Sequence, residues 1–344
     1  MANNQFDSQS LAQRFENWLH LLPGYLQSSA LRFRVWSLSF RGGVTLLCLA
    51  GLLLVPVTGN QYLTKIVITA MILAIFAASW DLLAGFAGQV SFGHAAFFGI
   101  SGYVTAAFVK FYGLHWIIAL FAGAGVAVVF SILIGIPCLR LKGPYLALGT
   151  LAFALILYNL FLTGTWLGGT QGISALPSLG NAFLVFYIIA AFMVASLIVM
   201  RAVVDSRLGT ILKAIRDDEV GADATGINTT TYKLIAFMIS GLFAGISGAL
   251  FVLDATAVNP ALYQPLYSFY AIIMASIGGI ATIYGSIVGS FLFTLLSEFL
   301  RPLAAASLLI FATLLILIVR FADEGVMNPF LEHVQDLWDK IRGK

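Results

Sequence analysis

The sequence predicts an all-α polytopic membrane protein, and three observations carry this prediction. Only 10% of the 344 residues are charged, against roughly a quarter in a soluble domain. Hydrophobic residues make up 60% of the chain, and the mean hydropathy is +0.97. Long stretches such as residues 182–200 are apolar on all sides, whereas strands of a membrane barrel would alternate apolar and polar residues. We therefore expect a helical bundle in a bilayer.

The length accommodates about ten spans, because a spanning helix needs about 20 apolar residues and the connections add more. Six expected spans precede a long polar segment and four follow it. The expected spans are residues 42–58, 62–83, 95–111, 116–138, 145–163, 182–204, 234–253, 266–280, 283–299 and 303–319. Before the first span, apolar residues recur on one face of residues 11–22, which predicts an amphipathic helix at the membrane surface.

The placement of Lys and Arg predicts the orientation. With a cytoplasmic N-terminus, ten crossings put residues 1–41, 139–143, 201–233 and 320–344 on one side of the membrane. These stretches hold about fifteen of the 18 Lys and Arg residues, as the positive-inside rule expects for the cytoplasmic side. Both termini are therefore expected in the cytoplasm.

Two segments, residues 84–94 and 276–285, are too rich in glycine to be plain spans. Unwound backbone at membrane depth is tolerated only where it is buried in protein or lines a wet cavity. Residues 85–94 are therefore either backbone that lines a pathway, with Gln89, Ser91 and His94 adding polar groups, or a short cytoplasmic turn whose glycines serve packing. The sequence leaves these two interpretations open.

The longest internal polar segment, residues 205–232, is called the polar island below. Leu208, Ile211, Leu212 and Ile215 recur at helical spacing in it, which predicts one amphipathic helix with Gly226 as its stop. Its basic and acidic residues nearly balance, so a protein partner is favoured over anionic lipid as the binding surface for the apolar face. Asn228 or Thr229 would then cap the next span.

No phosphate-binding loop, metalloprotease or hydrolase motif occurs in the chain, so we expect no enzymatic activity, cofactor or metal site. The two cysteines have no metal-ligand spacing and are read as small core residues. Asp81, Asp254 and Glu298 lie near span ends, where we expect them to be solvated, although a carboxylate inside a membrane is a candidate proton or ion site. His94 is interpreted as a core histidine with satisfied hydrogen bonds.

Several sequence blocks resemble the M-type permeases of bacterial branched-chain amino-acid ABC importers. The resemblance covers residues 65–319. It rests on GQVSFGHAAFFGISGY from Gly88, LRLKGPYLALGTLAF from Leu139, GGTQGI from Gly168, AIRDDEVGADATGIN from Ala214, KLIAFMISGLFAGISGALF from Lys233 and GGIATIYGSIVGS from Gly278. Urea and short-chain amide importers have similar permeases, so the blocks identify the family better than the substrate.

The resemblance implies a permease in the bacterial inner membrane that works with a homologous second permease, two cytoplasmic ATPases and a periplasmic binding protein, without nucleic acid. ATP would then be hydrolysed by the partners. The implied domains are a cytoplasmic segment (1–41), the permease domain (42–319), which includes the polar island as coupling segment, and a cytoplasmic tail (320–344). The expected pathway residues are Gln89, Ser91, His94, Tyr145, Thr150 and Gln171, the last standing where the family usually has Asn. The residues expected to couple to the ATPase are Arg216, Asp217, Glu219, Ala222 and Gly226.

An ion-coupled transporter or channel is the alternative from another class. Such a carrier usually needs carboxylates in the middle of its spans. The importer needs a cytoplasmic docking helix instead, and the sequence favours the importer.

Overall fold

The computed structural model describes residues 51–303 except 142, together with residues 309, 310, 313 and 316. The chain divides into two units, Met1–Gly59 and Asn60–Lys344. The described part of the first unit contains the short helix η1 (Val55–Thr58). The expected amphipathic helix, the C-terminal tail and Cys48 lie outside the described residues, as do most of the expected first and last spans.

Six helices of the second unit are long and apolar enough to cross a membrane, among the residues that the structure describes. They are α3 (Gln61–Asp81) with its continuation η2 (Leu82–Phe86), α4 (Ala95–Tyr112), α5 (Trp116–Cys138), α6 (Pro144–Thr163), α7 (Ala182–Asp205) and α10 (Thr229–Ala255). The pair α11 (Pro265–Gly278) and α12 (Ile283–Phe299) bends by 113° and would make a seventh span if it counts as one. The chain is therefore an all-helical, multi-pass membrane protein.

The ends of these helices follow from local sequence. Asn60, Asn181 and Asn228 precede α3, α7 and α10, and each side chain accepts a hydrogen bond from a backbone N–H in the first turn. An asparagine at this position satisfies donors that the helix itself leaves unpaired. Proline opens α6 and α11, where its missing N–H costs nothing. The expected cap at Asn228 is confirmed.

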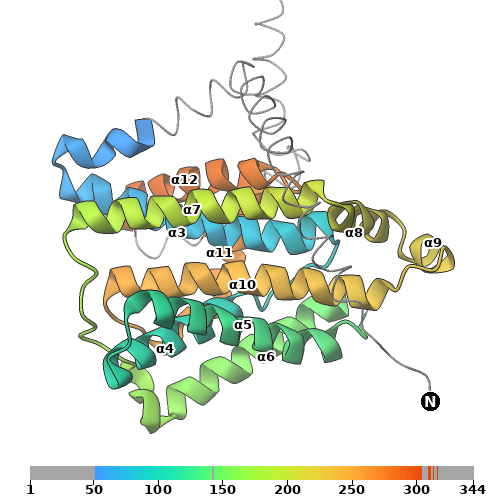
Figure 1. The fold of residues 1–344 in the computed structure, drawn as a ribbon, viewed down its shortest axis with the longest axis horizontal. Coiled ribbons are helices and arrows are strands. Elements are labelled where there is room, and N and C mark those ends of the chain that lie inside the picture. Colours follow the sequence, from blue (N-terminus) through green and yellow to red (C-terminus); the bar gives the residue numbers. More distant parts are fainter. Residues whose placement is uncertain (1–50, 142, 304–308, 311–312, 314–315, 317–344) are drawn as a thin grey trace, which may run out of the picture. The chain divides into compact units, whose positions relative to one another are not determined.

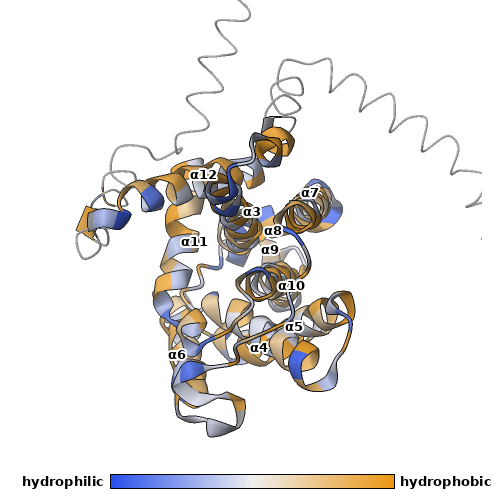
Figure 2. Ribbon diagram, turned by 90° about the vertical axis from the view of Figure 1, so that its left-hand side faces the viewer, coloured by the Kyte–Doolittle hydropathy of each residue, from blue (hydrophilic) through white to orange (hydrophobic). Residues whose placement is uncertain are grey.

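Helices α3 and α10 form the centre of the second unit. α10 packs against α4, α5 and α3, while α3 also packs against α7, α11 and α12; Figures 1 and 2 show this arrangement from two directions. Small residues permit the close approach, since a Cβ added at Gly241 would lie 2.8 Å from Ser131 of α5. Cys138, at the end of α5, is buried, as expected of a core residue.

Short helices join the long ones. η3 (Thr165–Leu167) and η4 (Gly169–Gln171) follow α6, η5 (Pro260–Tyr263) precedes α11, and η6 (Arg301–Leu303) follows α12. The polar island holds two helices, α8 (Arg207–Asp217) and α9 (Glu219–Ala224), so the expectation of one helix was wrong. The backbone of Asp218 is extended, and its side chain accepts a hydrogen bond from Gly221 N, so Asp218 ends α8 and caps α9.

Candidate functional site

The chain turns back into the bundle after η2. Residues 87–94, called the re-entrant loop below, run back along α3 rather than away from it. Trp80 Nε1 donates to Ser91 O at 2.8 Å, and His94 Nε2 lies 2.9 Å from Ser79 Oγ. By His94 the loop is therefore level with residues of α3 that lie before η2.

Hydrogen bonds to α10 indicate how deep this position is. Ser240 Oγ donates to Ser79 O at 2.7 Å, and Ser240 lies in the middle of α10 (Thr229–Ala255). Since α10 is long enough to cross the membrane, His94 and Ser79 lie near the middle of the bundle. α4 thus begins inside the bundle and not at its surface.

Side chains from two further helices hold the re-entrant loop. Thr150 Oγ1, on α6, accepts a hydrogen bond from Phe92 N at 3.1 Å. Ser268 Oγ, on α11, accepts one from Ala95 N at 2.9 Å. A Cβ at Gly93 would collide with the backbone oxygen of Thr150, so this position requires glycine for close approach. Protein side chains thus satisfy these two backbone donors at a depth where lipid could not.

Two polar atoms of the loop have no partner among the described residues. Ser91 Oγ and His94 Nδ1 are fully buried and unbonded, while Gln89 is half-buried and donates to Ala87 O at 3.0 Å. Buried polar groups without partners are rare in proteins and usually have a cause such as water, an ion or a function. His94 is buried with its Nε2 beside Ser79 Oγ, as expected of a core histidine, while its Nδ1 has no partner among the described residues.

The second glycine-broken segment meets the first at Asp81. Asp81, the last residue of α3, is fully buried, and its Oδ1 accepts a hydrogen bond from Ala281 N at 2.7 Å, in the break between α11 and α12. A Cβ at Gly85 would lie 2.5 Å from that same nitrogen. Both segments that the sequence marked as broken are therefore breaks, and they pack against each other. The expectation that Asp81 is solvated was wrong.

The other two carboxylates have partners as well. The side chain of Asp254 is only 9% exposed and pairs with Lys65, so the expectation of a solvated Asp254 was wrong too. Glu298 pairs with Arg301 and accepts from Tyr62 Oη.

The structure brings together three of the six expected pathway residues. Ser91, His94 and Thr150 are buried around the re-entrant loop, with Gln89 beside them at its half-buried start. Tyr145 is exposed in the first turn of α6, whereas Gln171 is exposed in η4, beyond the other end of α6. These two lie at opposite ends of the helix.

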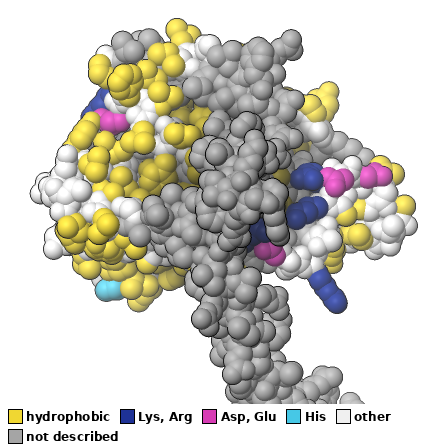
Figure 3. Space-filling model, turned by 90° about the horizontal axis from the view of Figure 1, so that it is seen from above, with side chains coloured by type: hydrophobic (Ala, Val, Ile, Leu, Met, Phe, Trp, Pro, Cys, Tyr) yellow, Lys and Arg dark blue, Asp and Glu magenta, His cyan; other side chains and the backbone are white. Residues whose placement is uncertain are grey.

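The apolar face of the polar island packs on the chain itself. Leu212 and Ile215 are buried, and α8 packs against α7, α10 and η2. The expectation that Leu208, Ile211, Leu212 and Ile215 fill a partner's groove is therefore wrong for the two buried residues. The island instead exposes charged residues and Val220, which is 75% exposed. Figure 3 shows side chains of both charges gathered at the end of the molecule where α8 and α9 lie.

Ion pairs and a hydrogen bond hold the polar island on the bundle. Arg216 pairs with Asp217 at 2.9 Å and donates from Nη1 to Gly85 O at 2.8 Å, which joins α8 to the start of the first glycine break. Glu219 pairs with the buried Lys233 of α10. Ala222 is buried in α9.

Gly226 follows α9 with a φ of +87°, and its N–H donates to Asp223 O at 2.9 Å. The left-handed stop expected at Gly226 is confirmed, although it ends α9 and not α8.

Sequence reasoning missed three serines and a lysine. Ser79 contacts the ring of His94, Ser240 donates to Ser79 O and Ser268 accepts from Ala95 N. Lys65 pairs with Asp254. The available signal was the presence of a hydroxyl or a charge inside an expected span, where polar groups need partners.

Comparison with known proteins identifies the family. Residues 62–319 match the family described as branched-chain amino acid transport system / permease component. The high-affinity branched-chain amino acid transport system permease protein LivM of Salmonella typhimurium is 28% identical, in a match that covers 75% of this chain and 68% of the relative. The LivM protein of Escherichia coli K12 is 27% identical with the same coverage. No solved structure matches the chain. The family match covers most of the sequence, and the chain therefore belongs to the permease components of branched-chain amino acid transport systems.

Proposed function

We propose that this chain is the permease subunit of an ATP-driven ABC importer and forms the transmembrane pathway for branched-chain amino acids. The observation that carries the proposal is the family match over residues 62–319. The names of the two LivM relatives support the substrate class. The six apolar helices and the bent pair supply the membrane bundle that such a subunit needs.

The partners follow from the class of transporter. We propose a homologous second permease, two cytoplasmic ATP-binding subunits and a periplasmic binding protein that delivers the substrate. The proposed location is the bacterial inner membrane, with about ten spans and both termini in the cytoplasm, which the distribution of Lys and Arg supports. The domains proposed are residues 1–41, 42–319 and 320–344.

The pathway is proposed to run past the re-entrant loop. Unwound backbone in the middle of a transporter commonly marks the place where substrate passes, because it presents N–H and C=O groups to the cavity. The unbonded atoms Ser91 Oγ and His94 Nδ1 and the half-buried Gln89 support this assignment. Thr150 would hold the loop, and Tyr145 and Gln171 would lie towards the two ends of the pathway.

The polar island is proposed as the coupling segment on which the ATPase docks. Its exposed surface, with Asp217, Val220 and Gly226, would contact the ATPase, since Leu212 and Ile215 are occupied by the bundle. Arg216 would carry the movement to the first glycine break through its hydrogen bond to Gly85 O. Glu219 and Ala222 would hold α9 in place, the first by its pair with Lys233 and the second by burial.

The two alternatives have less support. A urea or short-chain amide importer would share the fold, but both relatives named above are branched-chain amino acid permeases. An ion-coupled carrier could use the buried carboxylate of Asp81. That carboxylate is bonded to Ala281 N, where it holds two glycine breaks together.

Uptake measurements test the proposal. Cells that express the chain with its partner subunits should accumulate radiolabelled leucine and not urea, and uptake should stop when ATP is depleted while the ion gradients are clamped. The variant Glu219→Lys should be inserted in the membrane but should lose uptake and recover less ATPase on purification. Leucine uptake that persists without ATP, or uptake of urea alone, would contradict the proposed function.

A further inference from the structure

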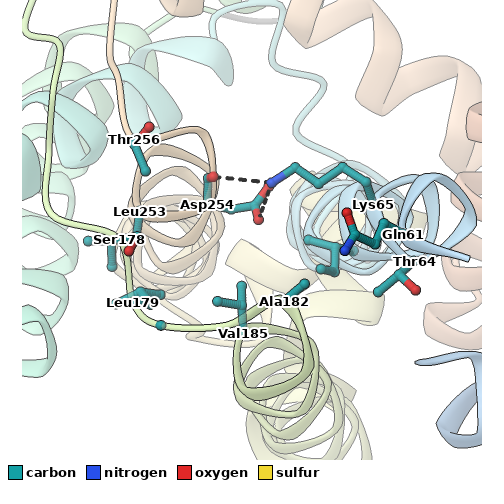
Figure 4. Close-up of a pocket in the computed structure, with 12 residues that line it drawn as sticks. Gln61, Thr64, Lys65, Ser178, Leu179, Ala182, Val185, Leu253, Asp254 and Thr256 are labelled. Carbon is teal, nitrogen blue, oxygen red and sulfur yellow. Dashed lines mark hydrogen bonds and ion pairs between the residues drawn. The ribbon is translucent and has the colours of Figure 1, made fainter. Parts of the chain in front are cut away.

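A cavity of about 200 Å³ opens between α3, α7 and α10, at the end of these helices away from α8 and α9. It is lined by the start of α3, the start of α7, the end of α10 and the segment that precedes α7. Figure 4 shows Lys65 reaching from α3 across this cavity to Asp254 on α10. The cavity is remote from the re-entrant loop and forms a separate site.

The two charges in the cavity are held differently. Lys65 Nζ lies 2.7 Å from Asp254 Oδ1 and 3.2 Å from Asp254 O. The side chain of Asp254 is 9% exposed, whereas that of Lys65 is 57% exposed. Asp254 is thus a fixed anion on the last turn of α10, and Lys65 is a long side chain that can swing outward. Opening the pair would leave the nearly buried carboxylate of Asp254 without its partner, so Lys65 would move outward only as another cation takes its place.

The rest of the cavity separates into a polar and an apolar part. Gln61 and Thr64 continue the polar side from Lys65 along α3, and Ile68, Val185 and Leu253 provide aliphatic walls from three helices. An engineered cavity of about 150 Å³ binds benzene, so about 200 Å³ accepts a molecule of the size of a small amino acid. One cation, one anion and an aliphatic wall match the three parts of such a molecule.

We propose that this cavity binds the zwitterion of an aliphatic α-amino acid, with Lys65 pairing the carboxylate, Asp254 pairing the ammonium group and Ile68, Val185 and Leu253 contacting the side chain. The ligand would insert between the two charges and replace their mutual pair by two new charge-assisted bonds. The inference rests on the proposed function, to which it adds a capture site at the end of the bundle opposite the coupling segment.

Two other interpretations of the ion pair are outcomes of the test. The pair could serve only to hold α3 against α10. In that case it would not matter which of the two helices carries the positive charge and which the negative. The cavity could also hold the headgroup of phosphatidylethanolamine, which likewise carries an ammonium and an anionic group.

The decisive variant exchanges the two charges. Lys65→Asp with Asp254→Lys restores an attractive pair between the same helices, so the hold of α3 on α10 survives, but it reverses the direction in which a zwitterion must bind. We expect the double variant and the single variants Lys65→Met and Asp254→Asn to lower leucine uptake roughly tenfold or more, whereas Lys65→Arg retains it. The control exchanges Glu298 and Arg301, an exposed pair that contacts Tyr62 next to the cavity but does not line it.

Binding is measured directly with a thiol probe. Cys48 and Cys138 are replaced by Ser, Ser178→Cys is placed at the cavity, and the complex is purified without its binding protein. Leucine should slow labelling at least tenfold, while leucine methyl ester and 4-methylpentanoate, which each lack one charge, should not. This protection should disappear in the charge-exchanged variant.

Three results would overturn the site: no protection by leucine in the otherwise unmodified complex, full protection or full uptake in the charge-exchanged variant, or protection by phosphatidylethanolamine in nanodiscs that leucine does not change. Uptake of urea in place of leucine would instead contradict the proposed function. Because leucine protection is measured without transport, the two failures are distinguishable.

Discussion

The re-entrant loop and the polar island handle polar residues in opposite ways. The loop brings backbone, Ser91 and His94 into the middle of the bundle, where side chains from α3, α6 and α11 bond to several of their polar groups. The island buries Leu212 and Ile215 on the bundle and turns its charges outward. The loop is therefore specified by distant contacts, and the island by its own amphipathic pattern.

One hydrogen bond joins the polar island to η2, the turn just before the re-entrant loop. Arg216 Nη1 donates to Gly85 O, at the residue whose surroundings also include Asp81 and Ala281. A displacement of α8 can therefore reach both glycine breaks through this side chain, in addition to the packing of α8 on η2. We therefore predict that changes that disturb the packing of the loop act on folding, changes at the link act on coupling, and changes at the island act on docking.

The largest effect is expected at Gly93. Gly93→Ala places a methyl group against the backbone oxygen of Thr150, which cannot move without displacing α6. We expect a loss of about 3 kcal/mol or a failure to assemble, because overpacking against backbone is poorly relieved. Thermal unfolding of the purified complex measures this. Gly125→Ala is the matched control, since nothing lies within 4 Å of its added Cβ; equal stability of the two variants would contradict the tight fit of the loop.

The next effect is expected at Arg216. Arg216→Ala removes a charge-assisted hydrogen bond to Gly85 O, worth roughly 1.5–3 kcal/mol where such a bond is well formed. We expect about tenfold lower transport, with ATP hydrolysis that no longer responds to substrate. Arg201→Ala is the control, because Arg201 also pairs with an aspartate, Asp205, at 2.8 Å. If both variants transport equally well, the link between α8 and the glycine break carries no coupling.

Particular elements show what the sequence could predict. The span at Trp116–Cys138 was predicted to the residue, because apolar length and flanking polar residues define it locally. Asn228 and Gly226 were placed as cap and stop from short-range chemistry alone. The depth of the re-entrant loop was not predicted, since it depends on Ser240 and Ser268, which lie far away in the sequence.

The same distinction explains the errors. Asp81 is buried against the break that contains Ala281, two hundred residues away, whose N–H bonds to its carboxylate. The position of Asp81 near the end of a span could therefore not predict its burial. The apolar spacing in the polar island located a buried face correctly but could not tell whether a partner or the chain itself buries it. The surface that buries this apolar face can be identified only when the packing of α8 on α7 and α10 is known.

A smaller effect is expected at Gly226, which sharpens the role of the island. Gly226→Val forces a β-branched residue into the left-handed conformation at a cost of roughly 1–2 kcal/mol, while the space around the added Cβ is open. We expect a stable permease that recovers less ATPase and transports several-fold more slowly. Gly226→Asn should retain both properties, because asparagine tolerates this conformation. If the Gly226→Val variant recovers a normal amount of ATPase, the left-handed turn at Gly226 is not needed for the ATPase to dock.

The smallest effect on stability, and the sharpest test of the loop, is expected at Ser91. Ser91→Ala removes a buried hydroxyl that has no hydrogen-bond partner among the described residues, so the variant should be as stable as the parent or slightly more stable. If this hydroxyl lines the pathway, uptake of leucine should nevertheless fall several-fold, because substrate or water loses a bonding group there.

Ser101→Ala is the matched control: its hydroxyl in α4 is also buried and unbonded, but it faces Gly123 of α5 and not the loop. Uptake and thermal unfolding are measured on both variants and on Gln89→Ala. Reduced uptake only in the two loop variants supports the pathway, whereas parental uptake in all three makes the re-entrant loop a packing element.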